Sequence, residues 1–338
     1  MEGADGGRGP AGLARNGDGE AFRELAEPYR RELLAHCYRM LASAADAEDA
    51  VQDTMLAAWP NLGTFAGRAS LRTWLNRIAT NRCLNALRSA SRRPAMQASP
   101  VHDDPAEPPH VSEVTWLEPY PDLLLDGVPD QQPGPEARYE ASEAISLAFV
   151  TALQLLPPRQ RAALILCDVL GYRAGEAAGM LGTSYSSVAS ALKHARATMA
   201  RHSAAGGEPP PAPHSAAERA LIGKLTAAYT AADLDGLLEL LTDDVRLSMP
   251  PHPFEYRGRA TAAKGIGQLF AQGHRYRLIE TRANGQPAFA LYRQDPHAGI
   301  LHASGLLVAT LAGSRVSAMT MFTPYVLARF GLPRTLPA

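Results

Sequence analysis

Two proline-rich stretches divide the sequence into segments with different periodic patterns. Residues 94–138 hold ten prolines, nine carboxylates and one arginine, a composition that cannot bury enough apolar surface to pack alone. Residues 203–216 contain the run GGEPPPAP, which ends the preceding helix and stiffens a short spacer. In a chain of 338 residues, such breaks predict several domains instead of one core.

The segments between these breaks differ in periodicity. Apolar residues recur at helical spacing in residues 19–93 and again in residues 139–202. After residue 217 we expect two helices, followed by alternating segments typical of strands, such as residues 245–249, 288–293, 306–311 and 315–322. The predicted fold is multidomain: two all-α helical domains joined by an acidic proline-rich linker, then an α+β domain. The predicted boundaries are a disordered N-terminus at 1–18, helical domains at 19–93 and 139–202, linkers at 94–138 and 203–216, and the α+β domain at 217–338.

Cysteine usage and hydropathy exclude several protein classes. The three cysteines, Cys37, Cys83 and Cys167, lie far apart and form no C-x-x-C pair, so neither a disulfide framework nor a thiolate zinc site is expected. No run of eighteen apolar residues occurs, and the glycine-rich N-terminus lacks an apolar signal segment. We therefore predict a soluble, cytoplasmic protein without a metal, a cofactor or a membrane partner.

Charge is segregated within residues 19–93. Residues 54–102 contain seven arginines and no Asp or Glu, whereas Asp46, Glu48, Asp49 and Asp53 form an acidic face on the helix just upstream. A single charge run is usually a solvated helix face. Two faces of opposite sign in one small domain favour two binding surfaces instead, and the basic one would face a polyanion.

The basic surface has the side chains that nucleic-acid binding requires. On a helix over residues 70–88, at about 100° per residue, an aromatic ring, amides and arginines share one side, beside a core stripe of Leu71, Leu75 and Ile78. Aromatic rings stack on bases, amides read base edges and arginines bind phosphate. Trp74 alone would more often be a core residue, but its polar neighbours favour the surface. The candidate DNA-binding residues here are Arg68, Arg72, Trp74, Arg77, Asn81, Arg82, Asn85 and Arg88.

The second helical domain ends in a segment with the pattern of a helix-turn-helix, YRAGEAAGMLGTSYSSVASALKHARATM. Gly182 lies at the predicted turn, and Ser184 can cap the second helix. With Val188 and Leu192 facing the core, the opposite side is polar or basic, which suits the DNA major groove. An ordinary αα-hairpin is the alternative. The candidate DNA-binding residues on this helix are Ser186, Ser187, Ser190, Lys193, His194 and Arg196.

Three motifs in order carry a family resemblance. The segments DAEDAVQDTMLAAW, FAGRASLRTWLNRIATNRCLNALR and LPPRQRAALILCDVLGYRAGEAAGMLGTSYSSVASALKHARATM resemble signature regions of the sigma-70 family, in its extracytoplasmic-function subclass. The resemblance covers residues 19–202. It implies an RNA polymerase sigma factor, which directs promoter recognition and transcription initiation and performs no covalent chemistry.

The resemblance also implies a partner for each surface. The acidic helix, with Asp46, Glu48, Asp49, Gln52 and Asp53, would bind the β′ clamp of bacterial core RNA polymerase, whose β subunit is also an expected partner. The first basic helix would read and open the minus-ten element of promoter DNA, and the helix over residues 184–199 would read the minus-thirty-five element. The acidic linker would lie in the polymerase channel, where carboxylates mimic nucleic-acid charge.

This sequence departs from the family pattern in the strand-opening segment. Family members often carry Asp at the position of Asn85. Aromatic residues are few there, with Phe65 and Trp74 as the main candidates. The resemblance therefore assigns the helix to the minus-ten element without assigning individual bases.

The C-terminal part resembles a narrower group whose members carry a SnoaL-like domain. The segments TWLEPYPDLLLDGVPD, LLTDDVRLSMPP, YRGRATAAKGI and SAMTMFTPYVLARFGLP carry this similarity. It implies a conical α+β barrel with helices closing one side, a cavity inside, and regulation in place of a separate anti-sigma partner.

Enzymes with this fold often use a cavity Asp or His for proton transfer. The titratable candidates form no evident pair, and the two aspartates have the setting of a helix-to-strand turn. Because fold similarity alone does not carry function, we expect no catalytic residue and no enzyme activity, although a cavity could bind a small ligand. The candidates are Asp243, Asp244, His252, Tyr256, His274 and His302.

Two other function classes stay open. A helix-turn-helix regulator could act on DNA without polymerase, but it would leave residues 19–93 and the acidic linker unexplained. An isomerase-like or ligand-binding C-terminal enzyme with a regulatory N-terminal region is the other, and truncation after residue 204 should abolish its function.

Overall fold

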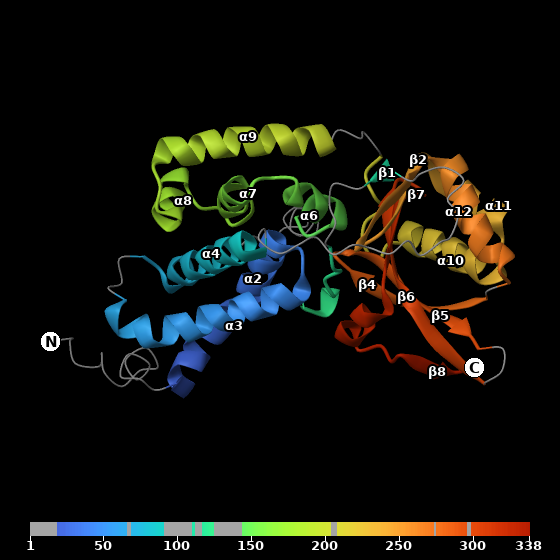
Figure 1. Cartoon of the computed structure of the whole chain (residues 1–338), viewed down its shortest axis with the longest axis horizontal. Helices are drawn as coiled ribbons and strands as arrows, with labels where there is room; N and C mark the ends of the chain where they lie inside the picture. The colour runs from blue at the N-terminus through green and yellow to red at the C-terminus, as the bar shows by residue number, and fades with distance from the viewer. Residues whose placement is uncertain are drawn as a thin grey trace. The chain divides into compact units, whose positions relative to one another are not determined.

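The computed structural model describes residues 19–65, 69–90, 110–111, 117–124, 144–203, 208–273, 275–295 and 299–338. These residues belong to two compact units that alternate along the chain. The helical unit lies within Met1–Ala95, Leu123–Ile145 and Ala152–His202, and the C-terminal unit within Met96–Asp122, Ser146–Thr151 and Ser203–Ala338. The predicted fold class, helical followed by α+β, is confirmed (Figure 1).

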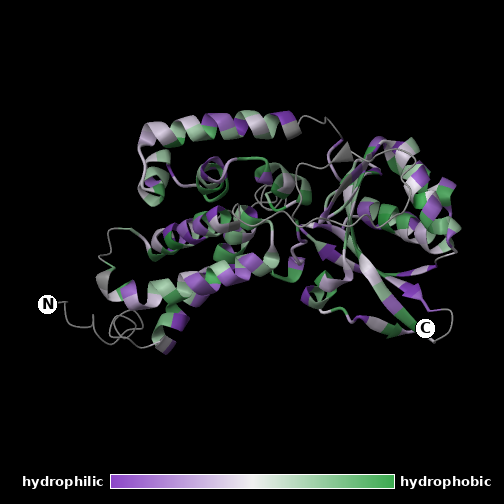
Figure 2. Cartoon of the chain, viewed as in Figure 1, coloured by the Kyte–Doolittle hydropathy of each residue, from purple (hydrophilic) through white to green (hydrophobic). Residues whose placement is uncertain are grey.

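The first helices of the helical unit are α2 (Gly19–Leu41), α3 (Ala44–Asn61) and α4 (Leu71–Ala90), with the short 3-10 turn η1 (Leu62–Thr64) after α3. Ser43 caps α3, because its hydroxyl accepts a hydrogen bond from the Asp46 backbone N–H at 3.1 Å. The helices pack through fully buried side chains, including Leu33, Val51 and Leu75. Figure 2 shows hydrophobic and hydrophilic residues alternating around α3 and α4, as amphipathic helices require.

The remaining helices of the helical unit are shorter until the last. Gly182 adopts a left-handed conformation, φ 61°, at the end of α8, where a side chain would be strained. The Ser184 hydroxyl then accepts from the Ser187 N–H at 3.2 Å and caps α9, which completes the predicted helix-turn-helix. The elements are α7 (Pro158–Leu164), the π-helix η3 (Ile165–Val169), α8 (Ala174–Leu181) and α9 (Tyr185–Ser203). They follow α6 (Leu147–Gln154), whose residues up to Thr151 belong to the C-terminal unit.

A buried arginine joins the two sets of helices within this unit. Arg161 of α7 is 5% exposed. Its guanidinium donates to the backbone carbonyls of Met40, Gln154 and Leu156. Because burial disfavours a charge, the pKa of Arg161 falls to about 10.

The C-terminal unit is built on one sheet, in the order β1-β3-β2-β7-β6-β5-β4, with β8 also paired to β6. Its pairs are antiparallel except β2 with β7, which is parallel. All four strand segments named from the sequence lie in strands. The strands are β1 (His110–Val111), β2 (Leu241–Met249), β3 (His252–Arg257), β4 (Tyr276–Ala283), β5 (Gln286–Gln294), β6 (Ile300–Ala312), β7 (Arg315–Phe322) and β8 (Thr335–Pro337).

Three helices cover one face of this sheet: α10 (Ala216–Ala231), α11 (Leu234–Glu239) and α12 (Arg259–Ala271) (Figure 1). Their apolar sides and the facing strands form one core, in which Leu225, Leu237 and Phe289 are almost fully buried. Tyr229 of α10 packs edge-on against the rings of Phe270 and Tyr276. The 3-10 turn η4 (Pro324–Phe330) follows β7.

Part of the predicted acidic linker belongs to the C-terminal unit. β1 lies within the predicted linker and pairs antiparallel with β3. Further along, Leu117 and Tyr120 are buried, and the 3-10 turn η2 (Asp122–Leu124) follows. The described pieces of the linker, residues 110–111 and 117–122, therefore pack, but against surfaces supplied by residues more than a hundred positions away, such as Asn284.

Candidate nucleic-acid interface

The acidic face of α3 is exposed along its whole length. Asp46, Glu48, Asp49, Gln52 and Asp53, the predicted polymerase-binding residues, are all exposed. The opposite side of the helix is buried against the unit's core, so the backbone holds these five side chains outward at fixed spacing. The helix therefore presents a rigid anionic ridge suited to a basic protein surface.

Two apolar side chains extend this face. The charge pattern of the sequence did not predict them. Leu56 is 60% exposed and Trp59 is 45% exposed. Leu56 follows Gln52 and Asp53 by four and three residues, and Trp59 follows Leu56 by three, so both continue the same helix face. That spacing was the available signal. Large exposed apolar side chains beside charged ones are typical of protein interfaces.

The predicted DNA-binding face of α4 is exposed in its central and last turns. Arg77, Asn81, Arg82, Asn85 and Arg88 are exposed. The Asn85 carboxamide accepts a hydrogen bond from Arg88, and the Asn81 side chain donates to the Arg77 carbonyl at 2.9 Å. Each amide keeps a further polar group for a ligand, so the face can offer both cations and hydrogen bonds to DNA.

The aromatic candidate on α4 lies at the edge of this face. Trp74 is half-buried, and its ring centroid lies 5.2 Å from that of Phe65, the other predicted aromatic. The structure thus brings the two rings together, as a stacking platform for bases would require.

Arg72 lies in a different environment from its neighbours. Its Nε is 2.8 Å from both Glu32 carboxylate oxygens, and its guanidinium lies 5.3 Å from the centroid of the Tyr172 ring. Burial alone would lower its pKa, but the hydrogen bond and charge of Glu32 raise the pKa of Arg72 above its ordinary value. Asn76 also donates to Glu32 and to Tyr172. The predicted phosphate contact by Arg72 would have to compete with Glu32, and Arg68 lies outside the described residues.

The helix-turn-helix presents its predicted face to the outside. Val188, Leu192 and Ala195 are buried, as the sequence pattern predicts. All six candidates on α9 are exposed: Ser186, Ser187, Ser190, Lys193, His194 and Arg196.

Two features of α9 were not predicted from its sequence. Arg196 makes a two-point ion pair with Asp168, at 2.6 and 2.9 Å, which orients its guanidinium. Tyr185, the first residue of α9, is 65% exposed. It stands beside the serines at the end of the helix that enters the groove in helix-turn-helix proteins. Its position directly after a capping serine was the signal for an exposed tyrosine at the start of this helix.

The titratable candidates of the C-terminal unit do not converge. Asp243 and Asp244 lie inside strand β2, so the predicted turn at these residues is wrong, and β2 begins earlier than the alternating pattern indicated. Asp243 is exposed and pairs with Arg259 at 2.9 Å, while His302 pairs with Asp295 at 3.3 Å. His252 and Tyr256 lie on β3, and His274 lies outside the described residues. Among the described residues, no hydrogen bond or ion pair joins two of these candidates.

The described residues lack two features that other functions would require. They contain no cluster of three or more His, Cys, Asp or Glu side chains able to hold a metal ion. No helix in the same part of the chain is both long enough and apolar enough to cross a membrane.

Comparison with known proteins decides the family. The family models for Sigma-70 region 2, Sigma-70 region 4 and the SnoaL-like domain match residues 25–93, 146–199 and 222–323. The ECF RNA polymerase sigma factor SigG of Mycobacterium tuberculosis is 43% identical over 337 residues, which cover 98% of this chain and 88% of SigG. The chain belongs to the ECF RNA polymerase sigma factors.

Other similarities agree with this assignment. The ECF sigma factor SigM of Mycobacterium tuberculosis is 31% identical to this sigma factor over 55% of the chain and 78% of SigM. The crystal structure of Mycobacterium tuberculosis SigJ, 22% identical, aligns with a TM-score of 0.62 over 92% of this chain and 99% of SigJ. The SigJ likeness shows that the fold, SnoaL-like domain included, is shared. The roles of individual residues of this sigma factor stay predictions.

Proposed function

We propose that this sigma factor binds core RNA polymerase through the acidic ridge of α3 and reads promoter DNA through α4 and α9. The ridge docks on the β′ clamp, and Leu56 and Trp59 add an apolar anchor to it. The exposed face of α4 engages the minus-ten element, and the exposed face of α9 enters the major groove at the minus-thirty-five element.

One observation carries this proposal. Within one unit, α3 exposes carboxylates while α4 exposes arginines and amides, and neither face is covered by other described elements. A protein that bound only DNA would have no need of a rigid anionic ridge, because the ridge repels phosphate. Two faces of opposite charge instead fit a subunit that bridges a basic protein surface and a nucleic acid.

The proposal predicts weak DNA binding by the protein alone. Each helical module offers only a few phosphate and base contacts, and specificity requires both modules at the spacing that polymerase sets. The affinity should fall steeply with salt, because each phosphate contact releases counterions.

Run-off transcription tests the proposal directly. Purified bacterial core polymerase is combined with a library of promoter DNA, with and without the full chain, and start sites are mapped. Factor-dependent start sites support the proposal. Binding of the protein alone to specific duplex sites, with no transcript, would instead support a helix-turn-helix regulator that acts without polymerase.

For the C-terminal domain we propose regulation without catalysis. Its described titratable candidates lie on β2, β3 and β6 with no hydrogen bond or ion pair between any two of them, and Asp243 and His302 are paired with Arg259 and Asp295, which does not favour a proton-transfer centre. Covalent attachment keeps this domain at high local concentration near the other modules. A small ligand in the domain stays a prediction, as does the cytoplasmic location.

A further inference from the structure

The linker residues Tyr120–Asp122 are held by the turn between β4 and β5. The Tyr120 N–H donates to the side-chain oxygen of Asn284 at 2.8 Å, and the Asn284 N–H donates to the Tyr120 carbonyl at 2.8 Å. Both residues are fully buried. Asn284 adopts a left-handed conformation, φ 57°, which asparagine tolerates better than most residues. The turn therefore recognises linker backbone through a reciprocal pair of hydrogen bonds.

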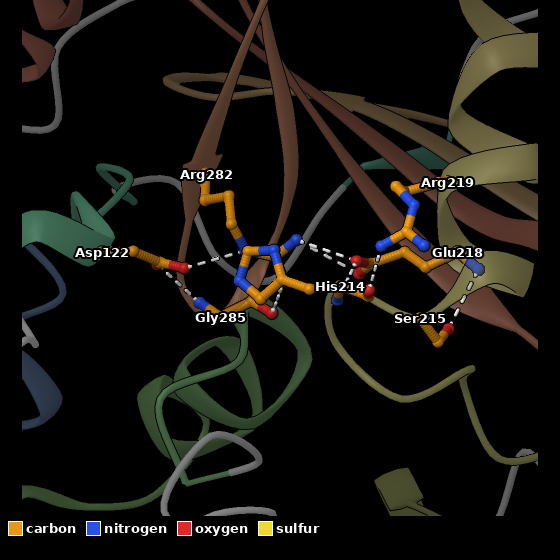
Figure 3. A network of polar contacts seen from close by, with 7 residues as sticks. All are labelled: Asp122, His214, Ser215, Glu218, Arg219, Arg282 and Gly285. Carbon is orange, nitrogen blue, oxygen red and sulfur yellow. Dashed lines mark hydrogen bonds and ion pairs between the residues drawn. The ribbon is translucent and has the colours of Figure 1, made fainter.

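A charged network fastens the same segment. Asp122 accepts from the Gly285 N–H at 2.8 Å and from Arg282 Nε at 3.4 Å. Arg282 lies between Asp122 and Glu218, as Figure 3 shows, and its Nη1 is 3.1 and 3.2 Å from the two Glu218 oxygens. The Glu218 side chain is only 4% exposed and that of Arg282 19% exposed, so this network is shielded from water. Asp122 is the one acid of the network that the linker supplies.

The linker also pairs with both edges of the sheet. β1 extends the sheet beyond β3 at one edge, with His110 opposite Glu255. Pro121 forms an antiparallel bridge with Ala283 of β4, at the other edge. Exposed strand edges are sites of unwanted pairing, and proteins cover them. Here the chain covers both edges with two short pieces of its own linker.

We propose that the C-terminal domain holds the linker as an internal ligand, and that core polymerase must take the linker from it. This inference rests on the proposed function, in which the linker lies in the polymerase channel. The linker backbone cannot pair with β3, β4 and the β4–β5 turn while it is threaded through another protein. The docked and polymerase-bound states of the linker therefore exclude each other, and the C-terminal domain lowers transcription by competing for it.

A reversible covalent lock tests this competition in the full chain. Paired residues at a non-hydrogen-bonded antiparallel bridge have Cα atoms about 4.5 Å apart, within disulfide range. The double variant Pro121→Cys with Ala283→Cys, in a Cys167→Ser background, is oxidised with oxidised glutathione, so that the linker cannot leave. Single-cysteine variants treated in the same way are the matched controls, since they contain the same substitutions without the cross-link.

The reduced double variant should direct factor-dependent transcription, and the oxidised one should lose it and recover on reduction. Failure of the disulfide to form would show that the linker does not dock in solution and would overturn the inference. Equal transcription by the oxidised and reduced forms would overturn it as well. If neither form supports transcription although the wild type does, the docked linker is not separable from the fold, and the inference is also lost. If the wild type itself gives no transcript, the proposed function fails instead.

A linker-side substitution tests the same competition in the opposite direction. Asp122→Ala removes the linker's carboxylate but leaves Arg282 paired with Glu218, so the domain keeps its internal ion pair. We expect more transcript than from the wild type at limiting core polymerase. Leu123→Ala, at a neighbouring side chain that is 73% exposed, is the control and should leave output unchanged. Equal output from Asp122→Ala and the wild type would contradict the inference.

Discussion

Mild acid should destabilise the helical unit through one buried histidine. His36 of α2 is fully buried, and its Nε2 lies 2.9 Å from the Thr80 hydroxyl oxygen. That hydroxyl donates its own proton to the Asn76 carbonyl, so the His36 Nε2–H must be the donor to Thr80. Nδ1 is then the site that a second proton would occupy, and it is buried without a hydrogen-bond partner.

The size of the effect follows from the pKa. Burial, assisted by the charge of Arg39, lowers the pKa of His36 from 6.5 to about 3. Because the folded-state pKa is depressed, the unfolded state binds the proton first. Stability is therefore full above pH 6.5 and is lost as the pH falls toward 3. Between pH 7 and pH 5 the loss is about 2 kcal/mol of unfolding free energy.

The measurement is urea unfolding of the full chain at pH 7 and pH 5, followed by tryptophan fluorescence. Other groups also titrate, so the wild type is compared with His36→Gln, which can still donate to Thr80 but cannot gain a proton. The wild type should lose about 2 kcal/mol more than the variant between the two pH values. Equal losses in the two proteins, or an NMR titration of His36 near 6.5, would refute the reasoning.

Four further outcomes are expected. Asp49→Lys with Asp53→Lys should abolish pull-down of core polymerase, because the net charge of the five ridge residues changes from −4 to zero. Trp59→Ala should weaken holoenzyme formation by about tenfold in a binding titration, the cost of losing an aromatic anchor. Lys193→Ala should reduce the slope of log affinity against log salt for promoter DNA by about one. Arg161→Met should lower the free energy of unfolding of the helical unit by about 3 kcal/mol in urea titrations, because three carbonyls lose their donor.

Matched variants separate these effects from general damage. Glu27→Lys changes the charge of an exposed residue on α2 and should leave polymerase binding intact. Lys224→Ala removes an exposed lysine from α10 and should leave the salt slope for DNA unchanged. The assignment of α3 would be wrong if Glu27→Lys and the double substitution weakened polymerase binding equally. If Arg161→Met had the same free energy of unfolding as the wild type, water would have replaced the hydrogen bonds that Arg161 donates.

The helices and their exposed faces could be predicted from sequence because their signals are local. On α3 and α9 the apolar stripe recurs within a few residues, so the positions of Val51 and Val188 already determine which faces are exposed. The same local pattern could not reveal that Arg72 is paired, because its partner Glu32 is forty positions away in the sequence. Spacing determines on which side of a helix a residue lies, and not what packs against that side.

For the linker too, local sequence predicts some features, whereas contacts with residues far along the chain could not be predicted. Its composition correctly indicates that it cannot pack alone, but the partners of Tyr120 and Asp122 follow more than 160 residues later. Their recognition depends on the side chains of Asn284 and Arg282 and on backbone groups of the β4–β5 turn, and no local pattern in the linker identifies these partners. Asp243 illustrates the converse, because acidic residues are rare in strands and predict a turn, whereas pairing with Arg259 is compatible with a strand.

The distance along the chain between the linker and its docking turn also has a consequence during synthesis. Gly285 is made 163 residues after Asp122. At translation rates of about 5–20 residues per second, the ribosome needs on the order of ten to thirty seconds to cover that distance. Once residue 203 has been added, the nascent chain contains both of the modules proposed to read the promoter, while the turn proposed to restrain the linker does not yet exist. If the C-terminal domain holds the linker as proposed, each newly made molecule passes through an unrestrained period before that domain has been made.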